Sequence, residues 1–444
     1  MGEGVLNTPS ALSPEAESAL LADASLLRVD GDLVMDGVPL ADIASAVGTP
    51  AYVYAASTIR ARYASLAAAL FDGVPRGRLH FAVKANGSLS VLRLLRDLGA
   101  GADIVSGGEL HRALAAGFAP EQIVFSGVGK TRRELEQAIA AGVGQINAES
   151  VEEIDLLARV ATGAGTPVRV GLRINPDVTT GTHPYISTGQ GGIKFGVPGD
   201  RIAEAVQLIQ AAPSLRLAAM AVHIGSQIID PAPYAAALKT LARAIAEVEA
   251  LGARIDTVDI GGGYGVRYGE AAGLDLGALS ATVGPILRQF AAEGRRVMSE
   301  PGRWLVGPAG VLLTETLYVK QAGGKTFVIV DAGMNDLLRP ALYGAYHHAL
   351  EVVEHGRATT VISLVGPVCE TGDFFAHDRA LPAVTSGEQL ALLGAGAYSF
   401  SMSSNYNARP RAAEVLVDRG GWRVIRARET MDDLLRGESL PAES

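Results

Sequence analysis

The feature that most constrains the fold is a repeated alternation of short apolar segments and longer helical segments between residues 57 and 302. The short segments are rich in β-branched and apolar residues and end in polar residues or glycine, which is typical of strands. Eight strands are expected, at residues 79–84, 102–106, 122–127, 145–149, 168–175, 217–225, 255–263 and 295–302, after a leading helix over 58–71. This number and length predict a closed (β/α)8 TIM-like barrel. An open doubly wound sheet is the alternative, because periodicity does not show whether a sheet closes.

After Pro301 the pattern changes to strands with little helix between them, which predicts a mainly antiparallel β-barrel or sandwich domain. Residues 30–55 are also strand-like and precede the barrel, so we expect them to join this second domain. The expected organisation is an N-terminal extension, joining strands, a barrel, a β domain and a polar tail, at residues 1–29, 30–56, 57–312, 313–435 and 436–444.

Composition excludes several classes of protein. Hydrophobic residues make up 48% and charged residues 19%, so the chain can bury a large core and is not disordered. The net charge is -9 and no long basic run occurs, which argues against nucleic acid or an anionic membrane as the main partner. No stretch approaches 18 uninterrupted apolar residues, and the first residues do not resemble a secretory signal. One cysteine, Cys369, cannot form an internal disulfide, so we expect a cytoplasmic protein.

Side chains that end the strands of such a barrel line its functional face. Lys84 ends the first strand, where an amine taken out of water is a better nucleophile and can form a Schiff base. The alternative is a lysine that forms an ordinary ion pair with a carboxylate. The sixth strand ends at His223 and Ser226.

The seventh and eighth strands end in a glycine run and a polar segment. Gly261, Gly262 and Gly263 allow backbone N–H groups to converge on an anion, although a simple glycine-rich turn is the alternative. Glu300 and Arg303 follow the eighth strand, and barrels often bind phosphate with the loops after these two strands. A lysine, a phosphate cradle, a histidine and a carboxylate together suggest pyridoxal phosphate, whose ring nitrogen a carboxylate such as Glu300 keeps protonated.

Several motifs closely resemble the meso-diaminopimelate decarboxylase family. They are HFAVKANG, DIVSGGEL, HIGSQ, DIGGGYG, SEPGRWLVGPAG, DAGMNDLLRPALYGAYH, GPVCETGDFF and GAYSFSMSSNYNARPRAAEVL, and the resemblance runs from about residue 30 to 430. It implies a pyridoxal-phosphate enzyme of fold type III, which is alanine racemase-like, with a barrel and a β domain. It also implies a homodimer in which each site is completed by the partner subunit, and decarboxylation of meso-2,6-diaminopimelate to L-lysine.

The resemblance further implies roles for individual residues. Lys84 would hold the cofactor as a Schiff base, and Cys369 would donate a proton in the partner's site. The cofactor would be bound by Lys84, Asp103, His223, Ser226, Gly261, Gly262, Gly263, Glu300, Pro301, Gly302, Arg303 and Tyr398. The substrate would be held by Arg303, Arg339, Tyr343, Glu370 and Tyr398. No metal is expected.

The chemistry of these residues agrees with such roles. A substrate with an amino-acid group at each end requires a carboxylate for the far ammonium and a guanidinium for the far carboxylate, and Glu370, Arg303 and Arg339 are of these types. A lone cysteine is ordinarily a small packing residue. Polar neighbours around Cys369 favour a loop instead, and therefore a reactive thiol.

Alternatives remain open. Decarboxylases of ornithine or arginine share the lysine, glycine and EPGR motifs, a pyridoxal-phosphate carrier or regulatory homologue would need no catalysis, and an amino-acid racemase has a similar barrel. His347, His348 and Glu351 could be imagined as metal ligands, but we expect them on a solvated helix face. His183 and Lys194 lie in a long glycine-rich segment to which no role is assigned.

Overall fold

The structure is a computed structural model that describes residues 12–178 and 194–441. The chain forms two units, each compact in itself. The barrel unit contains the described residues of Ile59–Val266 together with Ala272–Leu305, and the β unit contains the described residues up to Thr58, Arg267–Ala271 and those from Val306 onward. Among the described helices, none is long and apolar enough to cross a membrane.

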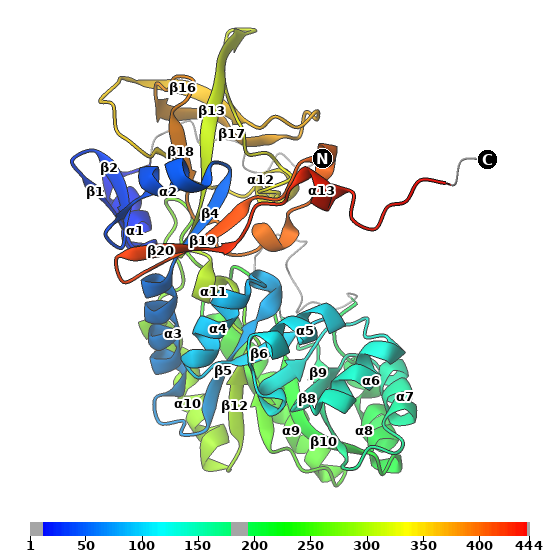
Figure 1. The fold of residues 1–444 in the computed structure, drawn as a ribbon. Helices are drawn as coiled ribbons and strands as arrows, with labels where there is room; N and C mark the ends of the chain where they lie inside the picture. The colour runs from blue at the N-terminus through cyan, green and yellow to red at the C-terminus, as the bar shows by residue number, and fades with distance from the viewer. Residues whose placement is uncertain (1–11, 179–193, 442–444) are drawn as a thin grey trace. The chain divides into compact units, whose positions relative to one another are not determined.

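Eight parallel strands of the barrel unit close into a barrel, which confirms the predicted fold and excludes the open sheet. Each strand pairs with the next along the chain, and β12 pairs with β5 to close the ring. Almost all residues of these strands are buried, and helices surround the barrel on the outside (Figure 1). The strands are β5 (Gly77–Ala82), β6 (Gly101–Ile104), β7 (Ile123–Phe125), β8 (Gln145–Ala148), β9 (Val168–Ile174), β10 (Leu215–Val222), β11 (Thr257–Asp259) and β12 (Arg296–Ser299).

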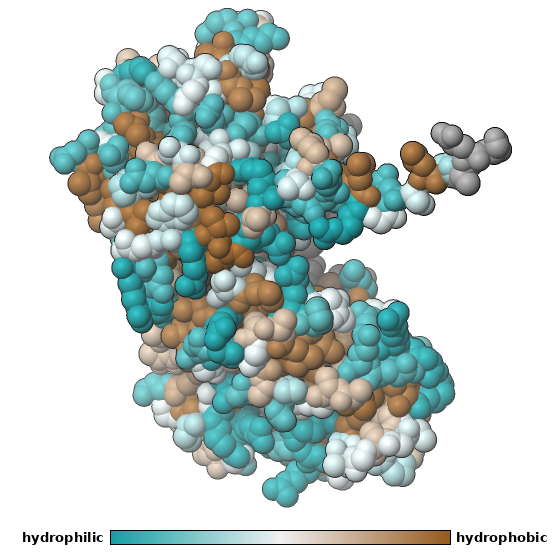
Figure 2. All heavy atoms as spheres, in the orientation of Figure 1, coloured by the Kyte–Doolittle hydropathy of each residue, from teal (hydrophilic) through white to brown (hydrophobic). Residues whose placement is uncertain are grey.

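Four helices of the barrel, α5, α6, α7 and α10, begin at a residue whose side chain caps the helix. Thr131 and Glu134 form a reciprocal capping box at the start of α6, and Ser150 accepts a hydrogen bond from the Glu153 amide at the start of α7. Hydrophilic residues cover much of the outward faces of α6 and α7 in Figure 2. The helices are α3 (Ala56–Phe71), α4 (Leu89–Asp97), α5 (Gly107–Ala115), α6 (Arg132–Ala141), α7 (Val151–Val160), α8 (Ile202–Ala211), α9 (Ala232–Ala250), α10 (Leu276–Ala292) and α11 (Arg303–Val306), with short 3-10 turns η1 (Val83–Ala85), η2 (Pro120–Gln122) and η4 (Gly199–Arg201).

The β unit is built on a mainly antiparallel sheet, as predicted. Its strand order is β17-β16-β14-β13-β4-β19-β20, and β18 pairs with both β13 and β15. Two pairs, β14 with β16 and β4 with β19, are parallel. The strands are β4 (Ala51–Ala55), β13 (Gly310–Ala322), β14 (Lys325–Val330), β15 (Ala349–Glu351), β16 (Thr359–Val365), β17 (Phe374–Pro382), β18 (Gln389–Leu392), β19 (Ala413–Asp418) and β20 (Gly421–Arg426), with short helices α12 (Arg339–Tyr343), η5 (Phe400–Met402), η6 (Tyr406–Ala408) and α13 (Met431–Leu434).

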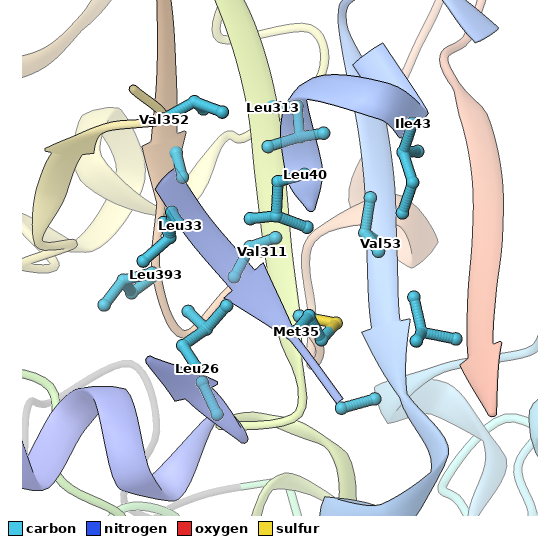
Figure 3. Close-up of a cluster of buried hydrophobic side chains, with 14 of the residues drawn as sticks. Leu26, Leu33, Met35, Leu40, Ile43, Val53, Val311, Leu313, Val352 and Leu393 are labelled. Atoms are coloured by element: carbon cyan, nitrogen blue, oxygen red, sulfur yellow. The ribbon is translucent and has the colours of Figure 1, made fainter. Parts of the chain in front are cut away.

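The first described segments of the chain belong to the same unit. They are α1 (Pro14–Asp23), β1 (Leu26–Val29), β2 (Asp32–Met35), β3 (Val38–Pro39) and α2 (Leu40–Val47), and the three strands form a separate antiparallel sheet. Leu33 and Met35 from β2 pack with Val311 and Leu313 of β13, and all four are completely buried (Figure 3). The hydrophobic effect thus joins the start of the chain to strands more than 250 residues later.

Candidate active site at the barrel mouth

Lys84 lies at the carboxyl end of β5, in the turn η1 that follows the strand directly. Its side chain is half-buried. The positive charge of Lys84 acts on three groups, favouring ionisation of the carboxyls of buried Asp103 and half-buried Glu300 and opposing protonation of half-buried His223. The fold therefore brings together four residues from four strand ends that the sequence predicts to bind one cofactor.

The glycine run after β11 is a tightly packed turn. Gly261 and Gly263 have φ values of 67° and 98°, which side chains rarely adopt. A Cβ atom on Gly262 would lie 2.1 Å from the carbonyl oxygen of Glu300, and one on Gly263 would lie 2.2 Å from that of Gly225. Glycine is therefore required because backbone from three strand ends meets here.

Two amides of this turn already have acceptors within the barrel. The Gly261 N–H donates to Oδ1 of Asp259 at 3.0 Å, and the Gly262 N–H donates to Nδ1 of His223 at 3.1 Å. The Gly263 amide has no acceptor among the described residues. Arg303 donates from Nη2 to the Ser226 hydroxyl at 3.0 Å, which places a cation and a hydroxyl together after β10 and β12. A phosphate at this turn would therefore rely on Gly263, Ser226 and Arg303 more than on all three glycine amides.

Substitution of Gly262 by alanine is expected to weaken cofactor binding and to destabilise the barrel by about 1–3 kcal/mol, because the added methyl group collides with backbone. Gly165→Ala is a matched control, since a Cβ at Gly165 meets nothing within 4 Å. Cofactor affinity and thermal unfolding of both variants measure the effect. Equal behaviour of the two variants would contradict the close approach.

His223 is held as a neutral ring. Burial, followed by the charges of Arg173 and Lys84, keeps the pKa of His223 well below its usual range. Because Nδ1 accepts the Gly262 amide, the ring proton lies on Nε2. The imidazole is therefore a flat, uncharged surface fixed against the glycine turn.

Beneath the mouth lies a chain of buried polar side chains that the sequence analysis did not identify. Asn147 donates from Nδ2 to the Ser126 hydroxyl at 3.2 Å and to Oδ2 of Asp259 at 3.4 Å. Ser126 in turn donates to Oε1 of Glu300 at 3.1 Å. Polar residues at the ends of successive strands could have indicated this chain, but the sequence does not show which of these residues contact one another.

This chain sets the charge of the carboxyl groups. Burial raises the pKa of Asp259 to about 6. Burial, followed by the negative charge of Asp259, holds the pKa of Glu300 well above its usual range. The carboxyl groups of Asp259 and Glu300 therefore share one proton at neutral pH. A cation that binds next to Glu300 would displace this proton.

Asp103 is the second-last residue of β6 and is fully buried. Burial, followed by the charge of Glu300, raises its pKa to about 8, and apart from the Ser126 hydroxyl its carboxyl oxygens have no hydrogen-bond partner among the described residues. Nearby, burial raises the pKa of Glu109 to about 7, although Glu109 accepts the Val105 amide at 2.8 Å. An unsatisfied buried carboxyl group is costly, which is typical of a site that a ligand completes.

The buried Asp103 makes stability depend on pH. Between pH 4 and pH 8 the folded protein keeps a proton that an unfolded aspartate loses, so the stability falls as the pH rises through this range. In the cofactor-free protein, wild type should lose this part of its free energy of unfolding as the pH rises, whereas Asp103→Asn should not. The free energy of unfolding of Asp103→Asn, relative to that of wild type, should therefore rise by at least about 1 kcal/mol from pH 5 to pH 8.5. Unfolding midpoints at both pH values measure this gain. The exposed Asp200→Asn control should show no such gain, and parallel profiles for Asp103→Asn and wild type would refute the assignment.

Arg339 and Tyr343 lie on α12 of the β unit. The Arg339 guanidinium stacks over the Tyr268 ring at 4.5 Å and approaches His347, with 2.9 Å between Nη1 and Nε2. Arg339 is buried, and Tyr343 is half-buried. Tyr398, after β18, has a φ of 54°, a backbone conformation that is uncommon for a bulky residue.

The expectation of a solvated helix face at His347 and His348 is wrong. Both residues are buried and precede β15 rather than lying on a helix. His347 also bonds through Nδ1 to the carbonyl of Leu393 at 2.8 Å, and His348 lies 3.1 Å from Glu17. Because these partners are distant in sequence, local periodicity could not indicate them. In the part of the chain that the structure describes, no group of three or more His, Cys, Asp or Glu side chains could hold a metal ion.

Cys369 lies on an exposed loop of the β unit, not in a packed core. Its amide donates to Oδ1 of Asn407 at 2.8 Å, and the neighbouring Glu370 accepts the Tyr406 hydroxyl at 2.8 Å. Asp373 accepts the Val368 amide at 2.6 Å, which closes the loop. The loop thus presents a thiol and a carboxylate side by side.

The mouth of the barrel fits the predicted pyridoxal phosphate. It offers the amine of Lys84, a glycine turn with no room for a Cβ atom, and the buried carboxyl group of Asp103, whose only described hydrogen-bond partner is Ser126. The donors of Ser226 and Arg303 suit a phosphate group.

Two residues of the long glycine-rich segment are assigned no role in this site. His183 lies outside the described residues, and Lys194 is exposed at the start of the second described range.

Comparison with known proteins identifies the family. Residues 56–307 match the family described as pyridoxal-dependent decarboxylase, pyridoxal binding domain. Diaminopimelate decarboxylase of Pseudomonas aeruginosa is 47% identical over 93% of this chain and 98% of its own, and that of Aquifex aeolicus is 44% identical over 91% and 94%. The crystal structure of diaminopimelate decarboxylase from Helicobacter pylori with L-lysine has a TM-score of 0.85 at 38% identity, covering 89% of this chain and 98% of that one. The chain therefore belongs to the diaminopimelate decarboxylase family of pyridoxal-dependent decarboxylases.

Proposed function

We propose that this protein decarboxylates meso-2,6-diaminopimelate to L-lysine and CO2 with pyridoxal phosphate as its cofactor. The observation that carries the proposal is similarity along both units, at 40–47% identity, to proteins named diaminopimelate decarboxylase. The presence of Lys84 at the barrel mouth and of Cys369 on an exposed loop supports catalysis over a carrier or regulatory role.

In this proposal the barrel unit binds the cofactor. When bound, pyridoxal phosphate accepts the electron pair that loss of CO2 leaves on the substrate carbon. Lys84 would supply the amine that holds the aldehyde, and Ser226, Arg303 and the turn Gly261–Gly263, chiefly through the Gly263 amide, would bind the phosphate. The neutral ring of His223 would hold the cofactor ring, and Glu300 would bind the ring nitrogen.

Other residues of the barrel support these groups. Asp259 and Ser126 orient the Glu300 carboxyl through the buried chain of polar side chains. Asp103 contributes a carboxyl group whose pKa the positive charge of Lys84 lowers. Pro301 and Gly302 belong to the same segment as Glu300 and complete the cofactor site in the proposal.

The β unit supplies selectivity and a proton. Arg303 and Arg339 are the guanidinium groups for substrate carboxylates, and Glu370 is the carboxylate for the far ammonium. Tyr343 and Tyr398 would complete the substrate site, and Tyr398 would also help to bind the cofactor. The Cys369 thiol, on a loop held by Asn407, protonates the carbon after CO2 is lost. We further propose a cytoplasmic homodimer in which Cys369 serves the partner's site.

The assay that tests the substrate compares CO2 release from meso-diaminopimelate, L-ornithine and L-arginine by the purified holoenzyme. We expect release from meso-diaminopimelate, with L-lysine formed in equal amount, and a far lower kcat/KM for the other two amino acids. Preference for ornithine or arginine would assign the enzyme to another basic amino acid. Racemisation without CO2 release would overturn decarboxylation itself.

A further inference from the structure

The barrel unit contains a polar cavity at the end opposite Lys84. This cavity, called here the floor cavity, has a volume of about 350 Å³ and lies at the amino ends of the barrel strands. Its wall includes Arg76, Arg78, His80, Glu121, Arg169 and Arg296. A neighbouring cavity of about 550 Å³ shares Glu121, Arg169 and Arg296 with it. The proposed catalytic chemistry uses none of these residues.

The charge of the floor cavity is not balanced by its own wall. Arg169 pairs with Asp256 at 2.7 Å, but Asp256 also pairs with Arg216 at 2.6 Å. Arg78 and Arg296 form no ion pair with any described residue. Glu121 is the carboxylate that lines the cavity. Although the chain has a net charge of -9, this local excess of positive charge attracts anions.

A buried histidine adds a second, independent sign of a ligand. His80 is 4% exposed and lies in the same wall, and apart from the backbone of Arg78 its Nδ1 atom has no hydrogen-bond partner among the described residues. Burial, followed by the charge of Arg78, lowers the pKa of His80 to about 4, so the ring is neutral at physiological pH. It therefore adds hydrogen-bonding capacity and no further charge. A buried polar group without a partner is rare in a protein that needs no ligand to satisfy it.

The guanidinium groups indicate the class of ligand. Arginine presents a rigid fork of N–H donors that matches the oxygens of phosphate, and several forks around one cavity favour an anion with more than one charge. We propose that the floor cavity binds a small phosphate-bearing anion, held by Arg78 and Arg296 with Arg76 and Arg169 beside them. The ligand is distinct from the cofactor, because the cofactor's amine and glycine turn lie at the carboxyl ends of the same strands.

Inorganic pyrophosphate is a suitable probe, and the holoenzyme is the suitable protein, because bound cofactor occupies the phosphate site at the mouth. Calorimetric titration at constant ionic strength should give one pyrophosphate per chain, with the cofactor absorption spectrum unchanged. In Arg78→Ala/Arg296→Ala the dissociation constant should rise roughly tenfold or more, which is about the contribution of one charge-assisted hydrogen bond. Arg243→Ala, at an exposed arginine of α9 that bonds only to Thr240 in the described chain, should bind as wild type does.

Each other outcome overturns the proposal. Absence of pyrophosphate binding to the holoenzyme, or equal weakening in the two variants, would show that the cavity is not a specific site. Binding that changes the cofactor spectrum and survives the double substitution would locate the anion at the mouth. Binding of citrate without binding of pyrophosphate would exclude phosphate as the recognised group. If the double variant does not fold, Arg296→Gln, which keeps a polar side chain, replaces it under the same criteria.

Discussion

Lys84→Ala is expected to lose decarboxylase activity by on the order of 10³-fold or more, the scale seen when a covalent group that acts as part of a unit is removed. The physical reason is that Lys84 is the amine placed directly at the end of β5, next to the carboxyls of Asp103 and Glu300. The variant should also lose the visible absorption of the covalently bound cofactor. Steady-state CO2 release and the absorption spectrum measure both losses.

Borohydride reduction separates the role of Lys84 from general damage. In wild type, reduction should fix the cofactor mass on the peptide that contains Lys84. Lys239→Ala, at an exposed lysine of α9, is the control and should keep both activity and the adduct. A cofactor adduct on any other lysine would remove Lys84 from the mechanism, even if the Lys84→Ala variant were inactive.

Cys369→Ala is expected to lower kcat by about 10²–10⁴-fold, the usual contribution of a positioned proton donor. Cofactor absorption should be unchanged, because Cys369 lies in the β unit, outside residues 56–307 that match the pyridoxal binding domain. Folding should also be unchanged, because the side chain is exposed in the chain. Single-turnover CO2 release together with L-lysine formation locates the loss, and unchanged turnover would exclude the thiol from the mechanism.

A mixture of the two inactive variants tests whether the site is shared between subunits. If Cys369 acts in the partner's site, a heterodimer of Lys84→Ala and Cys369→Ala contains one site with both wild-type residues. Activity should then reappear after the two proteins are mixed and allowed to exchange subunits. If subunit exchange is proven and activity still does not reappear, both residues belong to the site of a single chain. That result would not change the assignment of Lys84, because the borohydride adduct tests it separately.

Local signals determined more of the barrel than of the β unit. Each barrel strand is a short apolar run bounded by polar residues, and helix caps such as Thr131 with Glu134 lie within four residues of one another. In the β unit, apolar runs of the sequence coincide with β13, β14, β16, β18, β19 and β20, but no such run predicts β15 or β17. Strand β17 carries His377 and Asp378 at its centre, and Asp378 has a φ of 45°, so the alternation of apolar residues is interrupted.

The sequence by itself determined the alternation of strands and helices, the position of Lys84, the glycine run Gly261–Gly263 and the family resemblance, because each depends on neighbouring residues. The tertiary structure decided that the sheet closes, that Asn147 bonds to both Ser126 and Asp259, and that His347 is buried. It also decided which arginines meet at the floor of the barrel. These features depend on contacts between strands that lie tens or hundreds of residues apart, and the spacing of residues along a chain carries no record of which strand ends become neighbours.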